Sequence, residues 1–135
     1  MHRAYLFLIT GIVEVGTGVA LLFLPSVPLG LLLGVREAAP EVLFVGRVAG
    51  AALLALGVAS WLARSDKRSP AQQGLLIGVL IYDGTVAALL GYAGFVLRMV
   101  GIALWPAVVM HTGLAVWCVV CLWDKPRGES VESPG

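Results

Sequence analysis

The chain has 135 residues, of which 59% are hydrophobic and only 13% are charged, and its mean hydropathy is +0.95. Soluble domains usually carry about a quarter charged residues, so this composition excludes an ordinary water-soluble fold and indicates an integral membrane protein. The net charge of +1, without a basic patch interleaved with aromatic residues, excludes a general affinity for nucleic acid.

Four apolar stretches predict transmembrane helices at about residues 5–24, 42–63, 73–96 and 105–123. Each stretch approaches the roughly 20 residues that span a bilayer core. The first stretch resembles the apolar part of a signal peptide, but it carries Glu14 and no cleavage site of small residues follows it. We therefore expect it to be a retained helix.

Proline residues mark two of the helix ends. Pro25 and Pro28 follow the first stretch, and Pro106 suits the first turn of the fourth. Backbone groups in lipid must be bonded within the chain, and no alternating strand pattern occurs. The predicted fold is all-α: an integral membrane four-helix bundle with short loops.

Residues 1–123 form the predicted membrane domain, and residues 124–135 form a polar tail that we expect to be disordered. The first connection reads SVPLGLLLGVREAAPE and predicts a short interfacial helix between helices one and two. The segment FVLRMVGIAL, before the fourth helix, predicts a similar element.

Lysine and arginine are unevenly divided between the two predicted faces of the membrane. One face holds Arg3, Arg64, Lys67, Arg68, Lys125 and Arg127, whereas the other holds Arg36 and Arg98. The positive-inside rule then predicts a multi-pass protein of the cell (inner) membrane with both termini in the cytoplasm.

Four ionisable residues interrupt the apolar stretches: Glu14, Arg47, Asp83 and His111. A rise of 1.5 Å per residue places them within a slab about 10 Å thick near the membrane midplane. Each would cost about 2.5–3.5 kcal/mol if it faced lipid. We therefore predict that they face one another, with Arg47 pairing with Glu14 or Asp83.

Neighbouring hydroxyl groups are placed to complete the hydrogen bonds of this cluster; they belong to Thr17, Tyr82, Thr85 and Thr112. The cluster has three interpretations: a clasp that fixes helix register, a site for a lipophilic ligand with a polar head, or a proton pathway. Quinones, sterols and lipids are the ligand classes considered. A metal is not expected, because Arg47 would repel a cation.

No motif of a phosphate-binding loop, a serine hydrolase or a zinc protease occurs, so we assign no catalytic residue and no cofactor. The leading interpretation is a small, non-enzymatic membrane protein that binds a lipophilic ligand. One alternative is a membrane oxidoreductase or isomerase for a lipid-like substrate, with Asp83, Glu14 or His111 as acid and base. Another is an accessory subunit of a larger membrane complex.

Three pairs of glycines recur at four-residue spacing: Gly30 and Gly34, Gly46 and Gly50, and Gly74 and Gly78. Small residues at this spacing let helix backbones approach closely in lipid. The pairs predict packing within the bundle, with a homodimer face as the alternative.

Cys118 and Cys121 form the motif CVVC, which resembles the redox pair of the vitamin K epoxide reductase family. That family needs a second cysteine pair and this chain has two cysteines in all, so we interpret them as packing thiols. The segments GIVEVGTGVALLFLP, GRVAGAALLALGVASWLAR and WPAVVMH are similar to the bacterial DoxX-like group of four-helix membrane proteins. This resemblance implies a membrane protein without a settled activity and transfers no catalytic residue.

Overall fold

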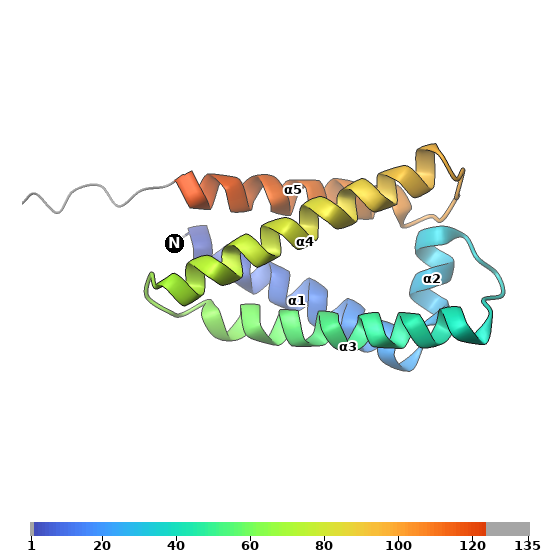
Figure 1. Ribbon diagram of the computed structural model, residues 1–135, viewed down its shortest axis with the longest axis horizontal. Coiled ribbons are helices and arrows are strands. Elements are labelled where there is room, and N and C mark those ends of the chain that lie inside the picture. Colours follow the sequence, from blue (N-terminus) through green and yellow to red (C-terminus); the bar gives the residue numbers. More distant parts are fainter. Residues whose placement is uncertain (1, 124–135) are drawn as a thin grey trace, which may run out of the picture.

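The computed structural model describes residues 2–123, which are all-helical apart from their connections. The helices are α1 (His2–Phe23), α2 (Ser26–Leu33), α3 (Pro40–Ala63), α4 (Pro70–Phe95) and α5 (Leu104–Trp123) (Figure 1). All except α2 are long and apolar enough to cross a membrane. The predicted four-helix membrane fold is confirmed, and the predicted tail at 124–135 lies outside the described residues.

The long helices begin one to three residues earlier than the hydrophobic stretches predict, and prolines explain two of these starts. Pro40 and Pro70 occupy the first turns of α3 and α4. A proline is favoured there because its missing N–H would be unpaired in any case. In addition, Ser69 Oγ accepts a hydrogen bond from the backbone N–H of Gln72 at 3.1 Å and so caps α4.

The four long helices are arranged as two pairs: α1 packs mainly on α3, and α4 mainly on α5 (Figure 1). The chain passes back and forth, so His2, the α3–α4 connection and Trp123 lie at one end, whereas α2 and the α4–α5 connection lie at the other. We call the first end the basic end, because Arg3, Arg64, Lys67 and Arg68 are there.

Glycines allow α1 and α3 to approach closely. A Cβ atom added to Gly50 would lie 2.8 Å from the carbonyl oxygen of Gly18 and 2.8 Å from the backbone nitrogen of Leu22. The prediction that Gly46 and Gly50 pack within the bundle is thus confirmed. Gly74 and Gly78 differ, because an added Cβ would meet nothing within 4 Å at either position.

The predicted helix in the first connection is present as α2, and Gly34 ends it. Gly34 adopts a left-handed φ of 73°, and its N–H donates to the carbonyl of Gly30 at 2.9 Å. Glycine adopts this conformation without the steric cost that a Cβ atom brings.

The predicted helix in the α4–α5 connection is absent, because residues 96–103 dock against α2 in a non-helical conformation. The N–H of Ala103 donates to the carbonyl of Leu31 at 2.9 Å. A Cβ atom at Gly101 would collide with the carbonyl oxygen of Leu32, so only glycine fits there. Arg98 takes a left-handed φ of 55°, which helical continuation would not allow.

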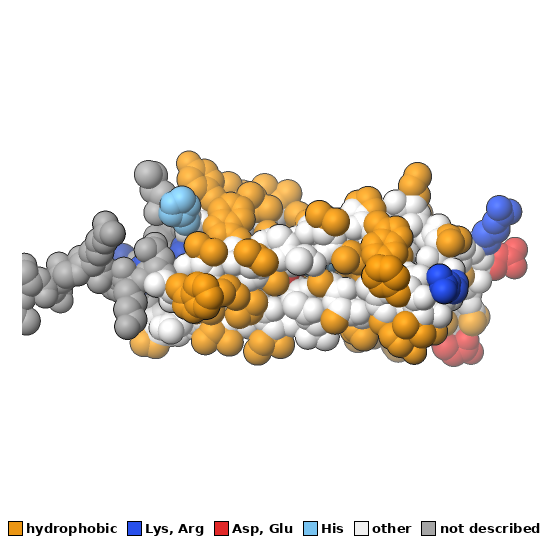
Figure 2. Space-filling model, turned by 90° about the horizontal axis from the view of Figure 1, so that it is seen from above, with side chains coloured by type: hydrophobic (Ala, Val, Ile, Leu, Met, Phe, Trp, Pro, Cys, Tyr) orange, Lys and Arg blue, Asp and Glu red, His pale blue; other side chains and the backbone are white. Residues whose placement is uncertain are grey.

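The apolar core is narrow, and much of the remaining apolar surface faces outward. The buried cluster includes Leu6, Phe7, Leu76, Val79, Leu114, Cys118 and Cys121, and no disulfide joins these two cysteines. Hydrophobic side chains cover much of the face shown in Figure 2, and the charged groups in view lie near its ends. Lipid solvates such a surface, whereas water does not.

Candidate functional site

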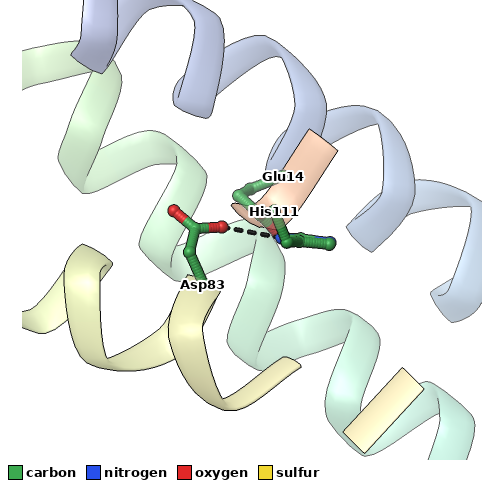
Figure 3. Close-up of side chains that lie close together, drawn as sticks. All are labelled: Glu14, Asp83 and His111. Carbon is green, nitrogen blue, oxygen red and sulfur yellow. Dashed lines mark hydrogen bonds and ion pairs between the residues drawn. The ribbon is translucent and has the colours of Figure 1, made fainter. Parts of the chain in front are cut away.

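Three of the four ionisable residues meet inside the bundle, and we call Glu14, Asp83 and His111 the buried centre. They project toward one another from α1, α4 and α5 (Figure 3). His111 Nδ1 lies 2.7 Å from Asp83 Oδ1, and one ligand-type atom from each of the three residues lies within 4.8 Å of the others. Their exposed fractions are 1%, 0% and 7%.

Helical spacing places each member on a buried face. Asp83 follows buried Leu76 and Val79 on α4, at offsets of seven and four residues. His111 lies seven residues from both Leu104 and Cys118, which are fully buried on α5. Residues at these offsets share one side of a helix, so the polar side chains are directed inward with the apolar ones.

Arg47 is not part of the centre, and the prediction that it pairs with Glu14 or Asp83 is wrong. Arg47 is exposed on α3, next to buried Gly46. The buried face of α3 is occupied by Gly46, Gly50 and Gly57, where close backbone contact with α1 leaves no space for a long side chain. Arg47 lies about 10 Å from the start of α3, within reach of the interface for a flexible guanidinium.

Tyr82 contacts two members of the centre. Its ring packs edge-on against His111, with centroids 5.8 Å apart and an interplanar angle of 79°. A side-chain hydrogen bond also joins Tyr82 to Glu14. Because a carboxylate can only accept, the Tyr82 hydroxyl is the donor when Glu14 is ionised.

The predicted threonines are placed differently from Tyr82. Thr17 is half-buried on α1, whereas Thr85 and Thr112 are exposed. The hydroxyl of Thr112 donates to the carbonyl of Val108 on its own helix at 2.7 Å. This back-bond satisfies the hydroxyl locally, so the prediction that Thr112 supports the centre is wrong.

Several polar atoms around the centre are buried and have no hydrogen-bond partner. Two are carboxyl oxygens of the centre, Glu14 Oε1 and Asp83 Oδ2, and two are the hydroxyls of Thr10 and Ser60. The sequence offered a signal for Thr10, which lies four residues before Glu14 and shares its helix face. Buried polar groups are nearly always bonded to protein, water or ions, so these atoms indicate an occupant.

The centre also joins the two helix pairs. Glu14 belongs to the α1–α3 pair, whereas Asp83 and His111 belong to the α4–α5 pair. Asp83 accepts from His111 when Nδ1 carries the proton, which orients the ring and leaves Nε2 for a further partner. Two carboxyl groups in a dry interior require protons or a cation to balance their charge. The arrangement can therefore hold protons, a hydroxyl-bearing molecule or a metal ion.

Comparison of the chain with protein-family models, with curated proteins and with solved structures gave no match. The resemblance to the DoxX-like group therefore stays a prediction, and the buried centre carries the functional argument.

Proposed function

We propose that this chain is a multi-pass protein of the cell membrane that binds the polar head of a lipophilic molecule at the buried centre. The observation that carries this proposal is the pair of unpartnered carboxyl oxygens, Glu14 Oε1 and Asp83 Oδ2. Ionised carboxyl oxygens accept hydrogen bonds, so the fitting head group is a hydroxyl that donates them. Quinols, sterols and diacylglycerols have such heads on apolar bodies.

The position of the centre supports this assignment. The two helix pairs contact each other less extensively than their members do within each pair, and the centre lies where they meet. An apolar body can insert along such a junction from the lipid, while the head group reaches both pairs. The basic end supports a cytoplasmic location for both termini, because the described residues there hold twice as many lysines and arginines as the opposite end's connections.

Binding is expected to depend on both carboxyl groups. In detergent, a photoreactive quinol, a sterol and a diacylglycerol probe are each titrated against the intact protein and its Glu14→Gln and Asp83→Asn variants. Both substitutions should weaken the preferred probe by about tenfold or more, because each removes a hydrogen bond to a charged group. Cross-linked fractions at increasing probe concentration measure the affinity.

Arg47→Gln is the matched control, because it also removes one charge from a membrane-spanning helix but lies outside the centre. It should bind the probes as the unmodified chain does. Equal labelling of all the variants would indicate partition into the apolar surface and would contradict the proposal, as would the failure of every probe to bind.

Metal binding is a second candidate function, favoured by one observation. One imidazole and two carboxyl groups offer ligand atoms within 4.8 Å of one another. This ligand set suits zinc, iron(II) or manganese(II), and three protein ligands leave a position open, as in catalytic zinc sites. The expected obstacle is gone, because Arg47 lies elsewhere on the surface.

The metal interpretation predicts about one divalent ion per chain after purification without chelators, as three-ligand sites hold one. Elemental analysis by mass spectrometry measures the metal content, which should fall to background in His111→Ala and be unchanged in Arg47→Gln. A content near zero in the unmodified protein, after addition of each metal in turn, would exclude this candidate and leave the hydroxyl ligand.

A further inference from the structure

A second polar site lies at the basic end, well away from the buried centre along the helices. It is a cleft of about 180 Å³ between the start of α1, the α3–α4 connection and the start of α4. Its lining residues are His2, Arg3, Ala4, Arg64, Asp66, Arg68 and Gln72. Three arginines and one aspartate leave two positive charges, so the cleft attracts an anion.

Two of the lining side chains are held in place while keeping unused polar atoms. Arg3 donates from Nη2 to the carbonyl of Cys121 at 2.7 Å, yet its buried Nε has no partner. Gln72 is 5% exposed and donates from Nε2 to the carbonyls of Ala63 and Asp66 at 3.2 and 3.1 Å. Its Oε1 is buried without a partner. The cleft is therefore pre-ordered, with a guanidinium donor still to be satisfied.

The surroundings of the cleft are those of a membrane interface. Arg64 lies over the ring of Trp61, 4.1 Å from its centroid, and also donates to the Trp61 carbonyl. Tryptophan with a cationic neighbour at the end of an apolar helix is typical of the headgroup level. An anion at this depth is most simply the phosphate of a lipid, which arginine binds through paired N–H groups.

An apolar groove on the same helix distinguishes a lipid from a free phosphate. The groove is lined by Leu22, Ala51, Leu54, Ala55, Val58, Ala59 and Leu62. Along α3 it extends over about 16 Å and ends at Leu62, two residues before Arg64. Such a groove suits an acyl chain, which free phosphate lacks.

We infer that the basic cleft binds the phosphate of an anionic phospholipid whose acyl chain follows the groove on α3. Arg3, Arg64 and Arg68 supply the positive charge, and the buried Nε of Arg3 gains a phosphate oxygen as its partner. The buried centre takes a different class of ligand, so the two sites are independent.

The test compares lipids retained by the full chain in native mass spectrometry after exchange into phosphatidylglycerol or phosphatidylcholine. The intact protein should retain one phosphatidylglycerol in preference to phosphatidylcholine. The double variant Arg3→Gln/Arg68→Gln should lose this preference by about tenfold or more, because each arginine near an anionic lipid contributes to binding. Arg36→Gln/Arg98→Gln removes the same charge from the opposite end and should keep the preference.

Further arms keep the result decisive. Arg68→Gln alone leaves the Arg3–Cys121 hydrogen bond in place and should still reduce the preference, even if the double variant unfolds. Asp83→Asn should retain phosphatidylglycerol normally, which separates this site from the buried centre. Equal losses in the variants of the two ends would overturn the inference. Displacement of the lipid by millimolar inorganic phosphate would assign the cleft to the free ion instead.

Discussion

Gly50→Ala is expected to lower the free energy of unfolding by about 2 kcal/mol, because overpacking at a tight contact typically costs 1–3 kcal/mol. The added Cβ would lie 2.8 Å from the carbonyl oxygen of Gly18 and 2.8 Å from the nitrogen of Leu22. Both neighbours are backbone atoms, so no side chain can rotate away and α1 must shift from α3. Unfolding of the purified protein in mixed micelles, titrated with a denaturing detergent, measures the change.

Gly78→Ala is the matched control, because an added Cβ there meets nothing within 4 Å. Alanine also has a helix propensity better than that of glycine by about 1 kcal/mol, so this variant should be neutral or more stable. The two substitutions are chemically identical and should act with opposite signs. Loss of stability in Gly78→Ala, together with loss of a dimer, would instead show that Gly74 and Gly78 form an interface between copies.

Asp83→Leu is expected to destabilise the protein by about 2 kcal/mol, because it leaves a buried donor unpaired. His111 Nδ1 lies 2.7 Å from Asp83 Oδ1, and the side chain of His111 is 9% exposed, so water cannot easily replace the carboxylate. Asp83→Leu/His111→Leu removes both partners and should regain most of the loss. The same detergent titration measures the single and double variants.

The control on the same helix is Thr85→Val, which changes an exposed residue outside the centre and should be close to neutral. The recovery in the double variant is the decisive result, because it measures the interaction and not the two separate side chains. If the costs of Asp83→Leu and His111→Leu simply add, the pair does not contribute to stability as proposed.

The membrane-spanning helices could be predicted because hydropathy over about 20 residues depends only on composition. Their starts were missed by up to three residues, since Pro40 and Pro70 belong inside the first turns and not before them. The connection at 96–103 was misjudged for another reason. Its conformation depends on contacts with α2, such as that of Ala103 with Leu31, which no local pattern reveals.

The buried centre could be predicted in part, because depth along a helix follows from counting residues. Glu14, Asp83 and His111 lie at matching depths and also face inward. Arg47 has a compatible depth but points elsewhere, since one residue rotates the side chain by about 100° around the helix. The direction of α3 is set by its glycines, and Gly46 faces α1 in place of its neighbour Arg47. Depth alone therefore could not decide membership of the centre.

The docking of α2 limits how the two helix pairs can move. At that end, the hydrogen bond from Ala103 to Leu31 and the tight fit of Gly101 fasten the α4–α5 connection to a helix that follows directly from α1. Any separation of the pairs would pivot there, as at the hinge of a clothes peg, and would open widest at the basic end. Such a motion would part Glu14 from Asp83 and His111 while leaving the hinge closed.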